Sequence, residues 1–325
     1  MSSTSNYLDP PFRITRTSHV CLTAADLGRA CDFYENLAGL VVTWRDSDAA
    51  YLRGVEEIAH HSLVLRRSAD GATCDVVGFR VASDRDLDAA KTYFDARGET
   101  VEWINVRGQL RTLRVRHSSG VTFELVAEME TQPRLLTHYA QHKGGKALRI
   151  DHVQVVVPDV GATGDAFIDM GFRAAEVIMD QTANKRIGLF MHRKNNPHDL
   201  VLAQGAGPRL HHAAFVTSDL QAIFRACDIA GTMGIGHEVE RGPGRHGPGN
   251  GTFVYFRDPD GHRLEMILPP MQYMDGEEEI RVWNSTDKHQ IVPWGAPAPQ
   301  RWREEATPFT GVPVAGDSLA RWTAR

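Results

Sequence analysis

Paired cysteines and long hydrophobic runs are both missing from this chain. The four cysteines form no C-x-x-C pair and lie in apolar stretches, at Cys21, Cys31, Cys74 and Cys227. A free thiol in such surroundings packs as a small hydrophobic side chain, and the pattern favours a reducing compartment. No apolar run approaches the length of about 18 residues that a membrane helix needs, and the N-terminus has no basic start followed by an apolar segment. We therefore expect a cytoplasmic location and no membrane partner.

Excess charge of one sign is missing as well. Lysine and arginine number 36 against 41 aspartates and glutamates, a net charge of −5, and no basic stripe stands out to neutralise a phosphate backbone. The sequence therefore predicts no nucleic-acid partner. Hydrophobic residues make up 42% and charged residues 24% of the chain, which is typical of a soluble globular protein. At about 150 residues per domain, the 325 residues favour two domains.

The chain contains an internal repeat. In each copy a β-rich run is followed by a turn with an aspartate, an amphipathic stretch and a glycine. The matched segments are 17–40 with 150–172, 76–87 with 211–220, and 116–126 with 257–267. The repeating unit is therefore about half of the chain.

Each half divides again into two modules, in which a strand and a helix are followed by several short strands. The modules begin near Arg13, Asp75, Leu148 and Leu210. This fourfold βαβββ pattern predicts an α+β fold with two tandem domains. The predicted units are an N-terminal domain over 13–131, a linker over 132–147, a C-terminal domain over 148–270 and a tail over 271–325. The tail is irregular but rich in aromatic residues, so we expect it to pack over the core.

Several side chains of the second half have the chemistry of a metal site. His152 starts the first strand of one module, the pair His211 and His212 starts the next, and Glu265 lies in the strand after the DPDG turn. Two imidazoles and one carboxylate make a facial triad, which leaves three coordination positions open and is diagnostic of non-haem Fe(II). Adjacent side chains of a strand point to opposite faces, so only one of His211 and His212 can bind the metal. Periodicity leaves open which one does.

The first half serves as an internal control, since a histidine on a strand is more often a core or surface residue than a ligand. His19 and Glu124 occupy the positions of the first histidine and of the glutamate. Val77 falls at the position of His212. One imidazole and one carboxylate would bind iron poorly. The first half is therefore predicted to be a scaffold without metal.

A second group of polar residues lies in loops of the second half. His198 lies in the segment MHRKNNPHDL, and a Gly/Pro-rich loop, ERGPGRHGPGN, contains Arg241, Arg245 and His246. Loops on a rigid scaffold often carry catalytic groups, although arginine and histidine in such a loop are also common as solvated surface residues. Tyr255 lies in TFVYF, just before the DPDG turn, where a half-buried strand aromatic is the ordinary interpretation.

Taken together, these motifs resemble those of one enzyme family. The segments LRIDHVQ, MHRKNNPHD, GPRLHHAAF, ERGPGRHGPGN and YFRDPDGHRLE are similar to those of the type I extradiol ring-cleaving dioxygenases of the vicinal oxygen chelate superfamily. Within that family, the similarity is greatest to the 3,4-dihydroxyphenylacetate (homoprotocatechuate) 2,3-dioxygenase group. The resemblance implies two tandem vicinal-oxygen-chelate (glyoxalase/bleomycin-resistance-like) domains, with the active site in the second and the tail packed over it. Members are commonly homotetramers, so a homo-oligomer is expected.

The resemblance also implies a reaction and a set of site residues. The implied reaction is cleavage of a catechol-type aromatic ring by O2, in aromatic degradation, giving a product of the muconic-semialdehyde type. The implied ligands of Fe(II), or of Mn(II) as in some relatives, are His152, His212 and Glu265. The other implied residues are the acid/base His198, the catalytic His246 and Tyr255, and the substrate-binding Gln154, Phe190, Arg241 and Ile267.

Three departures from the family pattern concern the substrate. Gln290 and Ile291 stand where relatives with a carboxylated substrate carry two arginines, and Ile267 stands where they carry a tyrosine. Losing a charge-assisted fork leaves a carboxylate poorly paired, at a cost of about 2 to 5 kcal/mol. We therefore expect a substrate other than 3,4-dihydroxyphenylacetate, unless Arg241 or Arg245 supplies the missing donor.

Two other functions share part of this pattern. An isomerase or lyase of the same superfamily would have the same modules, but a glyoxalase-like site draws its metal ligands from both halves, which Val77 and His198 oppose. A metal-free module that binds a small molecule would not need the full set of ligands together with the surrounding polar residues. The motifs therefore favour the dioxygenase.

Overall fold

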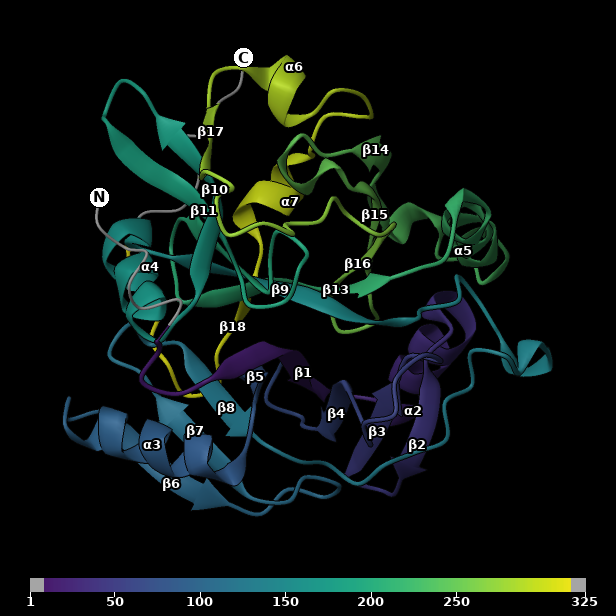
Figure 1. Cartoon of the computed structure of the whole chain (residues 1–325). Helices are drawn as coiled ribbons and strands as arrows, with labels where there is room; N and C mark the ends of the chain where they lie inside the picture. Colours follow the sequence, from purple (N-terminus) through teal and green to yellow (C-terminus); the bar gives the residue numbers. More distant parts are fainter. Residues whose placement is uncertain (1–8, 317–325) are drawn as a thin grey trace.

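A computed structural model describes residues 9–316 and divides them into two halves, each built around one mixed β-sheet. In Figure 1 the second half, in teal and green, lies above the first half, in purple and blue. The first half contains β1 (Ile14–Ala24), α2 (Leu27–Asp32), the π-helix η1 (Phe33–Ala38), β2 (Val41–Arg45), β3 (Ala49–Arg53), β4 (Leu63–Arg67), β5 (Cys74–Val81), α3 (Asp84–Asp95), β6 (Thr100–Ile104), β7 (Thr112–Arg116) and β8 (Thr122–Val126). Its strands lie in the order β2-β3-β4-β1-β5-β8-β7-β6.

The second half repeats this order of elements after the short 3-10 helix η2 (Tyr139–Gln141). It contains β9 (Arg149–Val157), α4 (Val160–Asp169), β10 (Arg173–Asp180), β11 (Lys185–His192), β12 (Leu200–Gln204), β13 (Arg209–Val216), α5 (Leu220–Thr232), η3 (Gly236–Glu238), β14 (Val239–Arg245), η4 (Pro248–Asn250), β15 (Thr252–Arg257) and β16 (Arg263–Ile267). Its strands lie in the order β14-β15-β16-β13-β9-β12-β11-β10-β17, in which the edge strand β17 (Arg281–Asn284) comes from the tail. The predicted α+β fold with four βαβββ modules is confirmed.

Aspartates in the turns start three of the four module helices. The side chains of Asp26, Asp159 and Asp219 accept hydrogen bonds from backbone N–H groups in the first turns of α2, α4 and α5. A carboxylate at this position satisfies donors that have no partner inside the helix. Gly39 ends η1 in the left-handed region, at φ +82°, where a side chain would be strained. The repeated pattern of aspartate, helix and glycine therefore has a direct structural cause.

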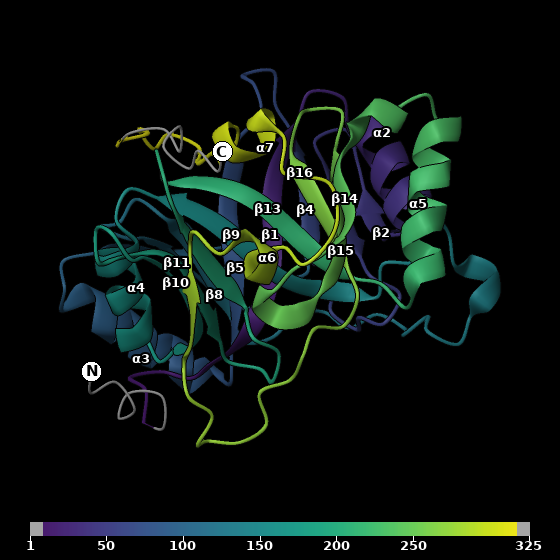
Figure 2. The same cartoon turned by 90° about the horizontal axis from the view of Figure 1, so that it is seen from above.

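One hydrophobic core joins the two halves. Phe79 from β5 lies against Phe167 of α4 and Phe172, with ring centroids 6.3 and 5.4 Å apart, and Phe123 from β8 lies 5.9 Å from Phe167. All four side chains are fully buried. In the view from above, α5 of the second half lies beside α2 of the first (Figure 2). Burial of these aromatic rings therefore stabilises both halves at once.

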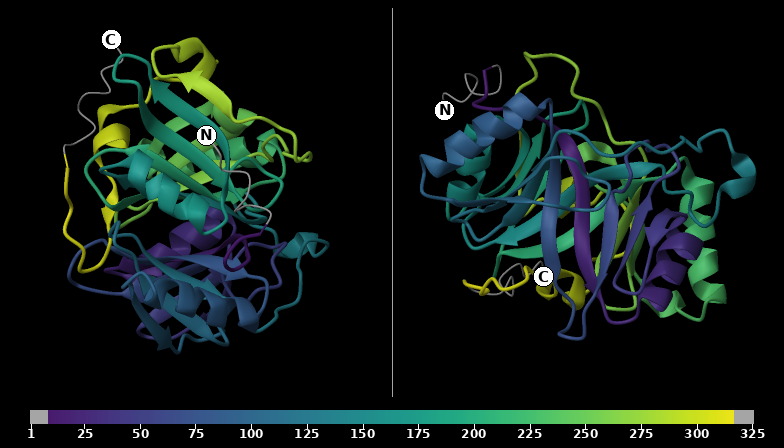
Figure 3. Two further views of the ribbon diagram at one scale, coloured as in Figure 1. Left: turned by 60° about the vertical axis from the view of Figure 1, so that its left-hand side comes forward. Right: turned by 90° about the horizontal axis from the view of Figure 1, so that it is seen from below.

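The tail adds structure to the second half that the repeat does not contain. It forms β17 (Arg281–Asn284), α6 (Lys288–Ile291), α7 (Gln300–Glu304) and β18 (Thr307–Pro308). β17 pairs with β10 and β18 pairs with β13. The tail then runs down the side of the second half to the first (Figure 3), where the N–H of Thr310 donates to the carbonyl of Cys74 at 2.9 Å. Residues 317–325 of the predicted tail lie outside the described residues.

The strand register corrects one detail of the sequence alignment. In the second half His152 and Glu265 both lie opposite Ala214, two residues after His212. In the first half the same position is held by Gly78, so Val76 and not Val77 corresponds to His212. The segments matched in the sequence, 76–87 and 211–220, differ in length, so pairing their first residues misplaced the valine by one position. The first half still lacks the second histidine.

No helix within residues 9–316 is long and apolar enough to cross a membrane.

The shared aromatic core predicts a large effect of one truncation. Phe167→Ala should lower the free energy of unfolding by about 3 to 5 kcal/mol, because it removes a buried ring and leaves a cavity. The measurement is denaturant unfolding followed by circular dichroism. Phe224→Ala, at a phenylalanine that is 50% exposed on α5, should cost less than about 1 kcal/mol. Similar losses in the two variants would contradict a core shared at Phe167.

Candidate metal centre

Three central strands bring the predicted ligands to one face of the second sheet. β16, β13 and β9 are neighbours, and Ala214 of β13 is the cross-strand partner of both His152 and Glu265. Cross-strand partners point to the same face, and so do residues two apart on one strand. His212 therefore shares this face and His211 does not. The register thus selects the second histidine of the pair, which periodicity alone left open.

The three side chains meet at distances that suit one bound metal. His152 Nε2 lies 3.2 Å from His212 Nε2 and 3.2 Å from Glu265 Oε2, and His212 Nε2 lies 3.0 Å from the same oxygen. Two atoms that bind a metal at about 2.1 Å and at right angles to each other lie about 3.0 Å apart. All three residues are at most 2% exposed. Two imidazoles and a carboxylate therefore form one triangular face of a coordination site.

Hydrogen bonds aim both histidines at this point. His152 Nδ1 donates to Asp151 Oδ2 at 2.8 Å. His211 Nε2 donates to the carbonyl of Trp302 at 2.9 Å, so His211 Nδ1 accepts from His212 Nδ1 at 2.7 Å. Each ligand histidine thus has its Nδ1 held by a hydrogen bond and its Nε2 directed at the triad, where a metal would take the place of a proton.

A second grouping of possible ligands is less suitable. Asp151, His152 and His198 also lie within 4.8 Å of one another. Both oxygens of Asp151 are already used, however, because Oδ2 accepts from His152 and Oδ1 accepts from Asn196 at 2.8 Å. The carboxylate that remains available to a cation is Glu265.

Electrostatics at the triad favour a bound cation. Burial works to raise the pKa of Glu265, but His212 and His152 hold it well below its usual range. Burial also opposes protonation of His152, yet hydrogen bonds to Asp151 and Glu265 raise its pKa to about 9, while burial lowers the pKa of His212 to about 4. Within residues 9–316, Glu265 Oε1 has no hydrogen-bond partner and lies 3.4 Å from His246 Nε2. A buried carboxylate with an unsatisfied oxygen fits a divalent metal.

Polar groups flank the triad on two sides. The ring of His198 lies 4.1 Å from that of His152, and burial followed by the charge of His152 holds the pKa of His198 well below its usual range. On the other side, His246 Nε2 lies 2.9 Å from the Tyr255 hydroxyl. Burial and then Glu265 raise the pKa of Tyr255 well above its usual range, so its hydroxyl stays protonated. Neutral groups that can exchange protons therefore stand on both sides of the triad.

All ten predicted site residues line one cavity of about 550 Å³. They are His152, Gln154, Phe190, His198, His212, Arg241, His246, Tyr255, Glu265 and Ile267. Arg241 is buried, and its guanidinium stacks 4.3 Å from the centre of the Trp302 ring. Arg245 does not line this cavity, and its Nη1 donates to the carbonyl of Asn250. Of the two arginines left open by the sequence, only Arg241 faces the site.

The tail contributes two residues to the site, of which the sequence assigned only one. Ile291, which the family resemblance placed beside the substrate, and Trp302, which it did not, both line the cavity, and the Trp302 carbonyl holds His211. A tryptophan-rich tail was the only sequence signal for Trp302, because no motif connects residue 302 to residue 211. Gln290 does not line the cavity, and its carbonyl instead lies close to Gly247.

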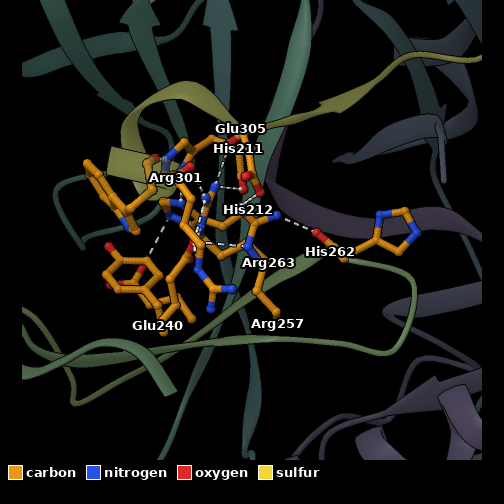
Figure 4. Close-up of polar contacts among 12 residues, drawn as sticks. His211, His212, Glu240, Arg257, His262, Arg263, Arg301 and Glu305 are labelled. Atoms are coloured by element: carbon orange, nitrogen blue, oxygen red, sulfur yellow. Dashed lines mark hydrogen bonds and ion pairs between the residues drawn. The ribbon is translucent and has the colours of Figure 1, made fainter. Parts of the chain in front are cut away.

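A buried cluster of charged residues fastens the tail beside the ligand strands (Figure 4). Glu240 accepts from Arg263 Nε at 2.5 Å and from Arg257 Nε at 3.0 Å, and Arg301 of α7 lies 3.4 Å from it. Arg263 Nη1 in turn donates to the carbonyl of His211 at 2.9 Å. The cluster therefore holds α7 and His211 in one arrangement, which fixes the hydrogen-bond chain from Trp302 to His212.

The first half contains a counterpart of this site in which an amide side chain lies among the polar groups. His19 Nε2 lies 3.0 Å from Glu124 Oε2, and the amide nitrogen of Gln109 lies 3.2 Å from the Nε2 atoms of both His19 and His61 and 3.3 Å from that oxygen. Thr112 donates to the amide oxygen of Gln109 at 2.8 Å and orients the side chain. An amide thus takes the central position among these groups. Neither Gln109 nor His61 was identified from the sequence.

Comparison with known proteins agrees with this geometry. The profile of the Glyoxalase/Bleomycin resistance protein/Dioxygenase superfamily matches residues 16–125 and 149–266. Homoprotocatechuate 2,3-dioxygenase from Brevibacterium fuscum, in complex with 3,4-dihydroxyphenylacetate, has a TM-score of 0.89 and 35% sequence identity, over 94% of this chain and 97% of that chain. The chain belongs to the extradiol dioxygenases of this superfamily. The predicted family is therefore confirmed.

Other members of the family give similar values. Homoprotocatechuate 2,3-dioxygenase from Arthrobacter globiformis has a TM-score of 0.90 and 34% identity, over 94% of this chain and 96% of that chain. A manganese-dependent 2,3-dihydroxybiphenyl 1,2-dioxygenase from Geobacillus genomosp. 3 is 29% identical over 300 residues, which are 87% of this chain and 94% of the relative. The similarity to extradiol dioxygenases thus covers nearly the whole chain.

Removal of the carboxylate should empty the metal centre. We expect the purified protein to hold about one divalent metal ion per chain, measured by plasma mass spectrometry, and Glu265→Ala to abolish it because two neutral imidazoles bind such an ion weakly. His19→Ala should leave the metal content unchanged. Full metal occupancy in the Glu265→Ala protein would rule out this centre.

The hydrogen bonds that join Trp302, His211 and His212 predict a partial loss of metal affinity when His211 is replaced. His211→Leu should weaken metal binding about 10- to 100-fold, as expected when the group that orients a ligand histidine is lost. His60→Leu provides a matched control, because His60 Nδ1 lies 3.0 Å from His61 Nδ1 in the same arrangement in the first half. Competition with a chelator measures the metal affinity of each variant. Unchanged affinity in the His211→Leu protein would show that the chain is not needed.

Proposed function

We propose that this protein is an extradiol dioxygenase that opens a catechol-type ring with O2 in aromatic degradation. The observation that carries the proposal is the triangular face formed by His152, His212 and Glu265 at one wall of a cavity large enough for an aromatic substrate. In this reaction the bond between one hydroxyl-bearing ring carbon and its neighbour without a hydroxyl group breaks. Both oxygen atoms of O2 enter a product of the muconic-semialdehyde type. No external reductant is needed.

Fe(II) is the proposed metal, with Mn(II) as the alternative that the manganese-dependent relative uses. His152, His212 and Glu265 would hold it and leave three positions open. When bound, the metal supplies positive charge that favours the catecholate and a route for electrons between the ring and O2. The same ligand set can hold zinc, but zinc has no redox chemistry, so the proposed reaction with O2 favours iron or manganese.

His198 is the proposed acid/base residue. Its Nδ1 has no hydrogen-bond partner within residues 9–316, and its low pKa keeps the imidazole neutral at neutral pH. A neutral imidazole can accept a proton from a catechol hydroxyl and return it later in the reaction. Its position against His152 would place it beside the open side of the triad.

Tyr255, His246 and Arg241 would act on the opposite side. The protonated Tyr255 hydroxyl and His246 can donate hydrogen bonds to oxygen atoms of the bound ring. Arg241 brings a positive charge to the site, and its Nε has no hydrogen-bond partner in the described part of the chain. Gln154, Phe190 and Ile267 would complete the wall around the ring and exclude water.

The domain roles follow from the same arrangement. Residues 13–131 would form a scaffold without metal, 148–270 the catalytic domain with 132–147 as the linker, and 271–325 a cover over the site. Support comes from Gln109 at the centre of the first half and from Ile291 and Trp302 in the cavity wall. We further propose a cytoplasmic homo-oligomer, with the tetramer of similar enzymes as the expected form. The four unpaired cysteines agree with a reducing compartment.

Two alternatives fit these residues less well. An isomerase or lyase with ligands from both halves would need a metal position shared between the sheets, whereas here all three ligands come from neighbouring strands of one sheet. A metal-free binding module would leave the buried carboxylate of Glu265 with an unsatisfied oxygen.

Substitution of His198 tests the proposed chemistry. His198→Asn should retain the metal and bind catechol, but slow ring opening by about 10² to 10⁴-fold because a positioned proton carrier is lost. Formation of the yellow ring-opened product measures turnover, and plasma mass spectrometry measures the metal. A matched control is His61→Asn, at the equivalent position of the first half, which should turn over at the rate of the parent protein. Loss of metal in the His198→Asn protein would instead make this residue a ligand.

A further inference from the structure

The cavity continues beyond the triad into an apolar arm. One wall of this arm is formed by Ile178 of β10 together with Ile187 and Phe190 of β11. Ile291 of α6 also lines the cavity, and it packs with Phe190 against the buried cluster of Ile178, Ile187 and Trp283. In the view from above, α6 lies between β10–β11 and β14–β15 (Figure 2). The tail therefore completes an apolar compartment next to the metal centre.

The cavity is larger than the reacting groups require. At about 30 Å³ for each water-sized group, the 550 Å³ cavity has room for about 18 such groups. Catechol and O2 together bring only ten non-hydrogen atoms. The remaining space has room for a substituent on the ring, and an apolar substituent placed there would be removed from water.

A buried cation of the cavity, Arg241, lies on the other side of the metal centre from the apolar arm. Phe190 neighbours His198, with ring centroids 5.5 Å apart, on the side of His152. Arg241 lies 5.9 Å from the centre of the Tyr255 ring and 4.9 Å from that of Phe253, on the opposite side. Lys288, His289 and Arg303 also border the cavity, but the first two are exposed and the third is half-buried. An ionised substituent in the apolar arm would thus lose its hydration without a buried cationic partner.

We infer that the substrate is a catechol whose ring carries an apolar substituent of about the size of a phenyl group. This inference rests on the proposed function, because it assumes that the two catechol oxygens face the metal. It adds that Ile291, together with Ile178, Ile187 and Phe190, determines which substituent is accepted. A carboxylated side chain is disfavoured because Ile291 presents no donor to it.

Anaerobic binding to the metal-loaded protein tests this inference without turnover. The ligands are catechol, 4-methylcatechol, 3-phenylcatechol, 4-phenylcatechol and 3,4-dihydroxyphenylacetate, and the measurement is the Kd of each by calorimetry. At least one phenyl isomer should bind about tenfold or more tightly than catechol, since it buries more apolar area. The inference is overturned if neither phenyl isomer binds more than about twofold tighter than catechol, or if 3,4-dihydroxyphenylacetate binds most tightly.

A pair of variants assigns the effect to the apolar arm. Ile291→Arg should remove the gain for the phenyl isomer and tighten binding of 3,4-dihydroxyphenylacetate about tenfold, because it replaces an apolar wall with a carboxylate donor. Ile280→Arg makes the same change at an exposed tail residue outside the cavity and should leave all five Kd values unchanged. Equal responses of the two variants would overturn the role of Ile291.

Admission of O2 separates the two proposals. If the phenyl isomer binds tightly but its ring is not opened, the proposed reaction fails and the substrate inference stands. If every catechol binds with the same Kd and is opened with the same kcat/KM, the proposed reaction stands and the inference fails.

Discussion

The cross-strand row of His152, Ala214 and Glu265 is the constraint on which the rest of the centre depends. Hydrogen bonding between β9, β13 and β16 brings an imidazole and a carboxylate to the same face, and Ala214 between them adds only a methyl group. A carboxylate that is 1% exposed is costly unless positive charge lies beside it. The sheet therefore brings together groups that are stable only in combination, and a bound metal would offset the cost of burying them.

The tail extends this constraint beyond the repeated fold. Glu240 and its arginine partners hold α7 against the ligand strands, and Trp302 then fixes His211 and through it His212. Buried ion pairs of this kind contribute little net stability but strongly favour one arrangement when every donor is paired. The same tail supplies Ile291 to the cavity wall. Ligand orientation and the shape of the cavity thus depend on one segment that has no counterpart in the first half.

The two halves show how one fold carries different chemistry. Both bring a histidine and a glutamate to the centre of a sheet, but the first half has Val76 at the position of the second histidine and fills the space with Gln109. The amide nitrogen lies within hydrogen-bond distance of the groups that would otherwise face a cation, so His19 Nε2 and Glu124 Oε2 have polar partners without a metal. Fold similarity between the halves therefore says nothing about function until the individual side chains are compared.

The fourfold module could be predicted from the sequence, because aspartate caps, glycine ends and alternating apolar residues act locally and repeat. The sequence also indicated that a histidine pair and a distant carboxylate belong to one site, and its motifs identified the family. Matching two segments of unequal length placed Val77 instead of Val76 at the position of His212. Periodicity defines faces only within one strand, so it did not separate His211 from His212, and only the family resemblance pointed to His212. Hydrogen bonds between the strands then place His212 on the face of Glu265.

The contribution of the tail was also beyond the reach of the sequence. The contact of Trp302 with His211 joins residues 91 positions apart, and the path between them has no periodic pattern that predicts it. The same holds for Gln109, which reaches His19 across 90 positions. Packing against Trp302 holds Arg241, which the family resemblance had indicated, at the cavity, whereas Arg245 lies outside it. Local patterns determine elements and faces, whereas contacts between distant segments arise only when the chain is packed, and these contacts decided the geometry of the site.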